Sequence, residues 1–431
     1  MHFNKRRLSA STVYLIFSGA NALFFATIVT VNLVYQVEVA RLNPLQLVLV
    51  GTALEIVCFL CQVPTGVLAD VYSRRLSVIL GVFLVGAGFI LEGSIPRFES
   101  IMLAQMLFGI GATFTDGAEQ AWITDEVGEL KVGPIFMRST QVGLLGGFLG
   151  ALLSVGLASI RLNLPLIVGG ALYVLLAVFL LRFMPENGFR RAPKGERQSW
   201  REMGRTFVSG LRLIRGRPVL MTILGIELFY GLSSEGFDRL SRAHLLANFA
   251  FPTLGQLQPV VWFGIFSIVG TILTLGATEV VRRRVDTNKQ RVVVRALFIM
   301  NVLNIVSVLV FALAGNFFLA VAAFLLYGVL RGVGHPIFMT WLAQNTDAKV
   351  RATVISTSGQ MNALGQIVGG PPVGYIGTAI SLRAAMVSVS VILSPVLLLL
   401  AYAFRKGKAQ VVPADKEESA APEVLETPEL V

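Results

Sequence analysis

The chain has 431 residues, of which 55% are hydrophobic and only 14% are charged. Soluble domains carry about 25% charged residues, so this composition excludes an ordinary soluble protein and indicates a polytopic membrane protein. The net charge of +11 raises the alternative of a nucleic-acid-binding protein, which the positions of the basic residues must decide.

Apolar segments long enough to cross a bilayer recur along the whole chain. A membrane-spanning helix needs roughly 20 predominantly apolar residues. We predict twelve spans, at about residues 12–35, 44–69, 76–93, 98–122, 137–160, 163–183, 218–240, 259–281, 292–314, 317–342, 352–378 and 381–404. Cys58 and Cys61 form a C-x-x-C pattern inside the second span, where we expect packing rather than metal or redox chemistry.

A polar segment divides the spans into two groups of six. We therefore expect an N-terminal bundle at 1–183, a basic cytoplasmic linker at 184–217, a C-terminal bundle at 218–404 and a disordered cytoplasmic tail at 405–431. Apolar residues of the linker recur at helical spacing among arginines, which fits either an interfacial helix or a solvated basic segment. Two six-helix halves are typical of a pseudosymmetric transporter.

The basic residues concentrate on one side of the membrane. With the N-terminus in the cytoplasm, the cytoplasmic segments include Arg74, Arg75, the linker and Arg282 to Arg284, and most other lysines and arginines. The positive-inside rule accounts for this distribution, so nucleic acid is not an expected partner.

The ten residues from Gly66 to Arg75, GVLADVYSRR, place an acid and two arginines between the second and third spans. A carboxylate beside helix ends, with arginines one turn away, can form charge-assisted bonds that hold two bundles together in one state. The sequence therefore predicts an inner gate at this connection.

This segment resembles the signature of the major facilitator superfamily, G-x-L-a-D-r-x-G-r-[rk]. Gly66, Asp70, Arg74 and Arg75 are in place, while Ser73 replaces the usual glycine. The resemblance implies an all-α membrane fold of twelve helices in two pseudosymmetric six-helix bundles. It also adds two members to the gate, Asp125 at the inner end of the fourth span and Arg138 at the start of the fifth.

Two further segments, Pro64-Thr65-Gly66 and Phe237-Asp238-Arg239-Leu240, are similar to those of bacterial drug-efflux permeases. That resemblance implies the inner membrane of a bacterium, both termini in the cytoplasm, a monomer in the lipid bilayer, and a small-molecule substrate. It implies a proton gradient as the energy source and no bound cofactor or metal. Many proton-coupled relatives carry an arginine at the position of Gln105, and the second copy of the signature, Gly276 to Arg284, lacks the acid.

Ionisable residues inside spans are costly and are functional candidates. Asp116 and Glu119 lie three residues apart, which puts them on one face of a continuous helix. Two close carboxylates disfavour double ionisation, so the pair is predicted either to bind the coupling proton or to partner the gate arginines.

In the second half, Glu227 and Arg331 fall about 14 and 16 Å from the inner ends of their helices, at matched depth. We therefore predict an ion pair between them, and Glu227 is a further candidate for proton coupling. His335, one turn from Arg331, either titrates near neutral pH or is structural.

The resemblance places spans 1, 4, 7 and 10 around a central cavity. The residues expected to line it are mostly aromatic with a few polar groups, which suits an amphipathic organic molecule. They are Asn21, Phe24, Phe25, Asn32, Glu55, Phe114, Phe229, Tyr230, Arg331, His335 and Trp341.

The favoured interpretation is a secondary transporter that exports a hydrophobic or amphipathic, drug-like compound by alternating access, through proton antiport. The first alternative is a proton-coupled uptake symporter for a small metabolite, since direction depends on which ligand each state prefers. A non-transporting receptor or a membrane enzyme is the second alternative. The sequence contains no Walker loop, no H-E-x-x-H and no nucleophile elbow, so we do not expect an enzyme.

Overall fold

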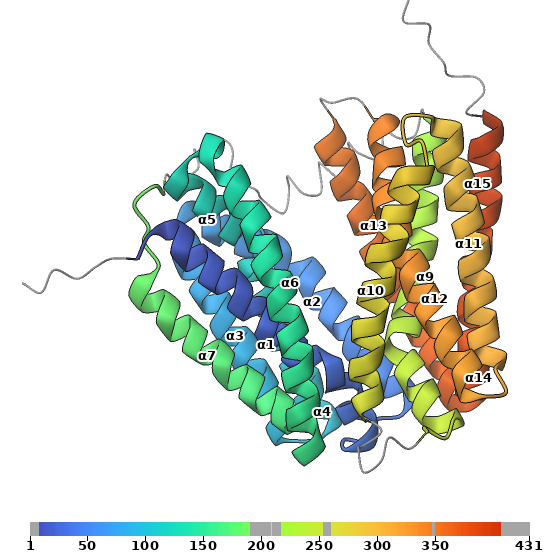
Figure 1. The fold of residues 1–431 in the computed structure, drawn as a ribbon, viewed down its shortest axis with the longest axis horizontal. Coiled ribbons are helices and arrows are strands. Elements are labelled where there is room, and N and C mark those ends of the chain that lie inside the picture. The colour runs from blue at the N-terminus through green and yellow to red at the C-terminus, as the bar shows by residue number, and fades with distance from the viewer. Residues whose placement is uncertain (1–7, 190–207, 209–216, 253–259, 347–349, 407–431) are drawn as a thin grey trace, which may run out of the picture.

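The computed structural model describes residues 8–189, 208, 217–252, 260–346 and 350–406. Within these ranges the regular structure is helical, with no strand, and the helices form two bundles (Figure 1). Most of the predicted linker at 184–217 and nearly all of the predicted tail at 405–431 lie outside the described residues.

The helices of the two halves follow the predicted spans closely. The N-terminal half contains α1 (Ala10–Glu38), α2 (Pro44–Val71), α3 (Arg74–Ser94), α4 (Phe98–Thr115), α5 (Ala118–Val127), α6 (Glu129–Ile160) and α7 (Leu164–Phe183). The C-terminal half contains α9 (Pro218–Asn248), α10 (Val260–Arg284), α11 (Gln290–Leu313), α12 (Phe317–Gln344), α13 (Arg351–Ala379), α14 (Leu382–Leu393) and α15 (Pro395–Lys406). Ten of the described segments are long and apolar enough to cross a membrane, each of α4–α5 and α14–α15 counting as one.

The fourth span differs from the single helix that we predicted. Asp116 ends α4 in an extended conformation, and Gly117 has a positive φ of 73° before α5 begins. A positive φ is readily adopted by glycine and rarely by other residues, so Gly117 permits the break. The residues on either side of the break therefore do not share one helical face.

The two halves meet at one end of the molecule and diverge toward the other (Figure 1). We call the end at which α2 passes into α3 the signature end, because it contains Asp70 to Arg75, and the other end the opposite end. At the opposite end α13 packs against α2, and α9 also contacts α1 and α2. The halves are apart at the signature end.

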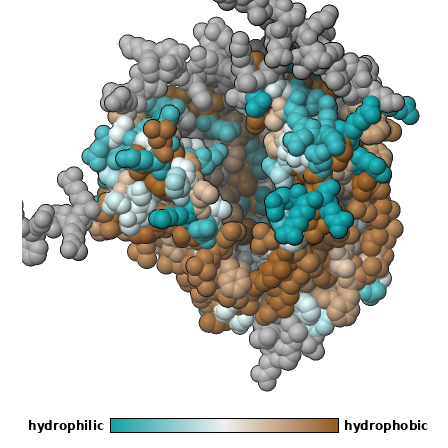
Figure 2. All heavy atoms as spheres, turned by 45° about the horizontal axis from the view of Figure 1, so that its top comes forward, coloured by the Kyte–Doolittle hydropathy of each residue, from teal (hydrophilic) through white to brown (hydrophobic). Residues whose placement is uncertain are grey.

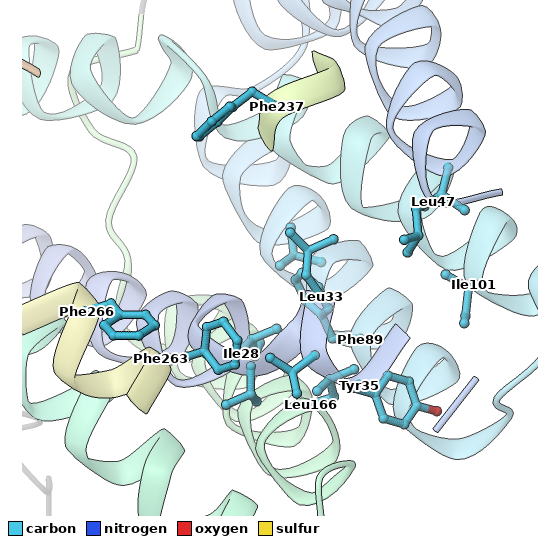
Figure 3. Packing of buried hydrophobic residues seen from close by; sticks show 14 of the residues in the cluster. Ile28, Leu33, Tyr35, Leu47, Phe89, Ile101, Leu166, Phe237, Phe263 and Phe266 are labelled. Atoms are coloured by element: carbon cyan, nitrogen blue, oxygen red, sulfur yellow. The ribbon is translucent and has the colours of Figure 1, made fainter. Parts of the chain in front are cut away.

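Buried hydrophobic side chains continue across the junction of the halves. One core cluster includes Ile28 and Leu33 of α1 together with Phe237 of α9 and Phe263 and Phe266 of α10 (Figure 3). A second cluster lies within the C-terminal half alone. The shared cluster explains why the halves stay together at the opposite end, since apolar burial stabilises by roughly 25 cal/mol per Å².

The surface viewed from the signature end has two features of a membrane transporter. Hydrophobic residues form a broad belt on the side that faces the viewer, and hydrophilic residues gather above it at the end that comes forward (Figure 2). A hollow separates the two halves at this end (Figure 2). The belt fits a lipid environment, in which apolar side chains face outward.

Candidate functional site

Arg74 joins three elements at the signature end. Its guanidinium forms a salt bridge with Asp125 of α5, donates to the backbone carbonyl of Ala121 at 3.2 Å, and lies 3.4 Å from Asp70 at the end of α2. Gly66, half-buried, lies one helical turn before Asp70 in α2. The structure thus brings together Asp70, Arg74 and Asp125, as the sequence predicted.

Ser73, which stands where the signature has glycine, begins α3. Its backbone is extended, with a φ of −173°, so no glycine is needed there. The hydroxyl accepts from Leu76 N at 2.9 Å as the N-cap and donates to the carboxylate of Glu186 at 2.7 Å. Glu186 also accepts from the backbone N–H of Arg75 at 3.0 Å. An acid at a helix N-terminus is favourable because the orphan N–H groups and the helix dipole are positive there.

Two expectations about this gate are corrected. Arg138 is exposed on α6 and forms no ion pair among the described residues. The cluster also lies wholly within the N-terminal half, since Arg75 donates to Leu181 O of α7 at 2.6 Å rather than to the other bundle. Because the halves are apart at this end, the cluster fastens helices of one bundle to each other in this conformation.

The second copy of the signature is a local cluster at the end of α10. Glu279 accepts from Arg282 and Arg283 at 2.6 Å, within the same helix and with exposed side chains. In the following turn, Lys289 and the backbone N–H of Asn288 lower the pKa of Asp286. None of these bonds reaches a neighbouring bundle, so the two copies are asymmetric.

At the opposite end, an ion pair of α9 packs against a glycine of α2. Arg239 Nε donates to Glu235 Oε1 at 2.9 Å, and both side chains are mostly buried. A Cβ atom added at Gly51 would lie 1.7 Å from Glu235 Oε1 and 2.2 Å from Arg239 Nε. We call this contact the Gly51 notch; only a residue without a side chain allows the two helices to approach so closely.

Helix α13 closes the same end against α2. A Cβ atom at Gly370 would lie 2.9 Å from Val48 Cγ1, and one at Gly374 would lie 3.0 Å from Val48 Cβ. Farther toward the end, Leu45 N donates to Thr378 Oγ1 at 2.9 Å. Small residues on α13 therefore allow the close packing that seals this end.

A cavity of about 750 Å³ lies between the halves, between the notch and the signature end. Residues of α1 and α2 form one side, and α9, α10, α12 and α13 form the other. Aromatic residues share its wall with ionisable ones, which are Glu55, Glu235, Asp238, Arg239, Arg242 and Arg331. Phe237, Phe263 and Phe266 belong to its aromatic wall.

A smaller cavity of about 410 Å³ lies inside the C-terminal half. Glu227 and Tyr230 of α9 line it, with His335 of α12 and Asn362 of α13, and Arg331 borders both cavities. Glu227 Oε2 accepts from Asn362 Nδ2 at 2.7 Å, and Asn301 Nδ2 donates to the Tyr230 hydroxyl at 2.8 Å. This recess therefore presents several hydrogen-bonding groups on a largely apolar wall that includes Met300, Phe338 and Ile355.

The predicted ion pair between Glu227 and Arg331 is wrong in this conformation. Arg331 Nη1 donates to both carboxylate oxygens of Asp238, at 2.7 and 2.8 Å, while Glu227 bonds to Asn362. Glu227 and Asp238 lie on nearly the same face of α9, about three helical turns apart, so the depth estimate was at fault and not the choice of face. Asp238, eleven residues after Glu227 on α9, is the acid that meets Arg331.

Most of the other predicted cavity residues serve packing. The Tyr173 hydroxyl donates to Asn21 Oδ1 at 2.9 Å, and Phe24 packs edge-on against the Tyr173 ring. Phe25 is partly exposed and stacks on Phe108. Trp341, at 0% exposure, is a core residue. Asn32, Phe114 and Phe229 are buried or half-buried and do not line either cavity.

The break at Gly117 changes the geometry predicted for Asp116 and Glu119. Asp116 is exposed at the end of α4, and Glu119 is half-buried in the first turn of α5. The two carboxyl groups lie on either side of the break, with Gly117 and Ala118 between them along the chain. The pair does not arise from i, i+3 spacing on one helix, but it remains a candidate proton site.

Sequence reasoning missed Glu92, in the last turn of α3. It is at 0% exposure and accepts from Gln36 Nε2 and from Gln105 Nε2, each at 2.7 Å. The rule that an ionisable residue in a span is a functional candidate applies to it, because Glu92 lies within the predicted span 76–93. Among the described residues, no three His, Cys, Asp or Glu side chains are arranged to hold a metal ion.

Two helix bundles that enclose a central cavity, closed at one end and open at the other, define a secondary-transporter fold. The sequence profile of the Major Facilitator Superfamily matches residues 10–300, and the chain belongs to this family. The predicted fold of twelve membrane helices in two halves is thereby confirmed. The protein is a membrane transporter of this type, and members of the family are generally not enzymes.

Similar proteins agree with this assignment. An uncharacterised MFS-type transporter of Bacillus subtilis (strain 168), YxaM, is 24% identical over 366 residues, which cover 82% of this chain and 86% of that protein. The nucleoside transporter NupG has a similar structure, with a TM-score of 0.71, 16% identity, and coverage of 93% of this chain and 100% of NupG. A bacterial homologue of the human lysosomal transporter Spinster, in an inward-facing, unoccupied conformation, gives a TM-score of 0.72 at 15% identity over 92% of this chain and 96% of that one. At these identities the structures show the fold alone.

Proposed function

We propose that this transporter exports an amphipathic small organic compound in exchange for protons. The observation that carries the proposal is the larger cavity, whose aromatic side chains and charged groups share one wall. A molecule with an apolar body gains from the phenylalanines, while its polar group meets the arginines and acids. An inorganic ion would leave the aromatic surface unused.

The smaller cavity supports a substrate with a hydrogen-bonding end. Asn301 Oδ1 and Asn304 Oδ1 are buried and accept no hydrogen bond from any described residue, and both residues line this recess. Buried polar atoms are nearly always satisfied, so a donor group from a ligand or a water belongs there. Arg331, at the border of the two cavities, would contact the substrate at its polar end.

The proposed orientation puts the signature end in the cytoplasm of a bacterium, with the protein a monomer in the inner membrane and both termini inside. The cytoplasmic assignment of the basic signature follows the positive-inside rule. In that orientation the conformation described here is open inward, as an exporter needs when it loads its substrate. The Gly51 notch and the α2–α13 contact then form the outer gate.

The proposed driving force is a proton gradient, with Asp116, Glu119 and Glu227 as candidate carriers of the coupling proton. Glu227 faces the smaller cavity, and Asp116 is exposed at the α4–α5 break. Each therefore lies where a change of protonation can alter the binding of a ligand. Unchanged pH dependence of transport in well-expressed Asp116→Asn, Glu119→Gln and Glu227→Gln proteins would exclude all three.

Expression in a bacterium that lacks its own efflux pumps, followed by growth tests against a panel of antibiotics and dyes, tests the export of amphipathic compounds. Each hit is then measured in inverted membrane vesicles. An antiporter accumulates the compound when the vesicle interior is made acidic, loses accumulation with a protonophore, and retains it without ATP. Uniformly unchanged growth across the panel would contradict drug-like export.

An uptake symporter for a metabolite is the second candidate. NupG, which has a similar fold, is a nucleoside transporter, and the polar recess around Asn301 and Asn362 would also suit a hydrogen-bonding metabolite. In the same inverted vesicles, a symporter releases its substrate outward together with protons when the interior is acidic. The sign of accumulation therefore separates the two candidates.

A further inference from the structure

The carboxyl group of Glu92 is enclosed by amides. Its Oε1 accepts from Gln36 of α1 and its Oε2 from Gln105 of α4, each at 2.7 Å, and Gln36 Nε2 also donates to Asn32 Oδ1 at 2.9 Å. Glu92 has no exposed surface and no salt-bridge partner among the described residues. The two neutral amide donors give each carboxylate oxygen a hydrogen bond, but they do not neutralise the negative charge of the carboxylate.

The charged and titratable neighbours of this carboxyl group are few. The Tyr35 hydroxyl donates to the backbone carbonyl of Glu92 at 2.7 Å, so it does not bond to the carboxylate. Among the described residues, the cation whose charge acts on Glu92 is Arg239, which belongs to α9 in the other half. Burial of a carboxylate is costly unless a cation compensates for it. The charge state of Glu92 therefore depends on where Arg239 lies.

The amide pocket can hold the group in both charge states. Gln36 Oε1 is buried and accepts no bond from the described residues. If the Gln36 amide rotates by half a turn, this oxygen faces Glu92 and accepts the proton of its carboxylic acid. The ionised form uses the amide as a donor, and the protonated form uses it as an acceptor.

Arg239 packs against the N-terminal half at the Gly51 notch. Its Nε lies where a side chain at residue 51 would otherwise stand, and it is held there by Glu235. When the halves part at this end, Arg239 moves away with α9, and its positive charge then acts less on Glu92. Closure brings that charge back.

We propose that Glu92 is a proton-binding site whose occupancy is coupled to the outer gate. This inference rests on the proposed function, which supplies the orientation of the protein in the membrane and the proton gradient that drives transport. With the gate open to the outside, the carboxylate takes up one proton; on closure, Arg239 favours the carboxylate and the same proton leaves. Asn32 accepts from Gln36, and the neighbouring Leu33 lines the larger cavity, so the amide pocket lies one residue from the wall of that cavity. Inward proton flow is thereby tied to the step that reopens the transporter to the cytoplasm.

A cysteine in the gate measures this coupling without any substrate. Thr52 is 6% exposed beside Gly370, and its hydroxyl has no hydrogen-bond partner among the described residues, so Thr52→Cys removes little. The variant is made with Cys58→Ala and Cys61→Ala, and a membrane-impermeant maleimide is added to the outside of whole cells. At each pH the labelling rate is divided by that of Glu38→Cys, an exposed site on α1, to correct for thiol ionisation.

The expected result is a corrected rate roughly tenfold higher at low than at high pH, equivalent to about 1.4 kcal/mol between gate states. In Glu92→Gln, which resembles the protonated acid, the rate should stay high at every pH. Glu99→Gln, an exposed acid at the same end, should behave like the parent. Gln105→Leu removes one donor from the ionised form, so its transition should move to higher pH.

An equal pH response in the parent and in Glu92→Gln would overturn the inference. If Glu92→Gln fails to fold, an unshifted transition in Gln105→Leu has the same meaning. Proton-driven export is measured separately in inverted vesicles. A pH-dependent gate without export would contradict the proposed function alone, and export with a Glu92-independent gate would contradict the inference alone.

Discussion

Asp238 and Arg331 join α9 to α12 at the border of the two cavities, with one guanidinium nitrogen 2.7 and 2.8 Å from the two carboxylate oxygens. Both side chains are about half exposed, at 44% and 47%, so the pair faces the space that a substrate would occupy. A pair of this exposure contributes about 1 kcal/mol or less to stability. Its importance should therefore lie in transport.

Asp238→Asn and Arg331→Gln are each expected to lower transport roughly tenfold, about 1.4 kcal/mol, while the melting temperature changes little. Asp238→Asn leaves the positive charge of Arg331 unbalanced, and Arg331→Gln leaves the negative charge of Asp238 unbalanced and removes its donor. The double variant Asp238→Arg with Arg331→Asp should recover part of the rate, measured as vesicle uptake. Recovery instead by Glu227→Arg with Arg331→Glu would show that the pairing changes during the cycle.

Gly51→Ala is expected to hinder closure of the outer gate, because the new methyl group would overlap Glu235 Oε1 at 1.7 Å. Overpacking of a close contact costs about 1–3 kcal/mol, enough to shift a two-state equilibrium by one to two orders of magnitude. The Thr52→Cys labelling assay should report a more open gate. Gly156→Ala is the matched control, since a Cβ there meets nothing within 4 Å. Equal labelling of the two variants would contradict a steric role for the notch.

Ser73→Ala should lower the free energy of unfolding of the N-terminal half by about 1 kcal/mol through loss of an N-cap. The hydroxyl also donates to Glu186, so that bond is lost as well. Thermal unfolding of the purified protein in detergent measures the change. Ser159→Ala, which removes only a bond to Val155 O within one helix, should be nearly neutral. A Ser73→Ala protein as stable as the control would show that the cap is dispensable.

Asn362→Leu should cost about 1–3 kcal/mol of stability, because the carboxyl group of Glu227, only 6% exposed, loses its donor. Glu227→Gln retains an acceptor oxygen for Asn362 and should be much less destabilising. Chemical unfolding of both variants in detergent gives the comparison. If Glu227→Gln proves the more destabilising of the two, the charge of Glu227 has a partner other than Asn362.

The sequence predicted well those features that depend on local pattern. Spans follow from apolar length, Asp70 and Arg74 follow from a motif with fixed spacing around one helix junction, and Asp125 was added by the family resemblance. The break at Gly117 was not predicted, although Asp116-Gly117 is a turn signal, because the span was inferred from the apolar residues on both sides of it. For the same reason the shared face of Asp116 and Glu119 was inferred wrongly.

Pairings between helices were harder, because they depend on helix tilt and on how neighbouring helices are offset along their axes. Equal depth suggested Glu227 for Arg331, whereas the acid that meets it is Asp238, about three helical turns farther along the same face of α9. Glu92 was overlooked because a single acid near a span end resembles an interfacial residue. Only the structure shows that two glutamines from α1 and α4 close over it.

The hydrogen bond from Leu45 N to Thr378 Oγ1 connects the first turn of α2 to the other half of the protein. The first amides of a helix have no partner in their own helix, so this one is satisfied by the opposing bundle. When the halves part at this end, water must replace the hydroxyl. The Leu45 amide should then exchange its hydrogen with solvent. The hydrogen–deuterium exchange rate of this backbone amide therefore measures how often the sealed end opens.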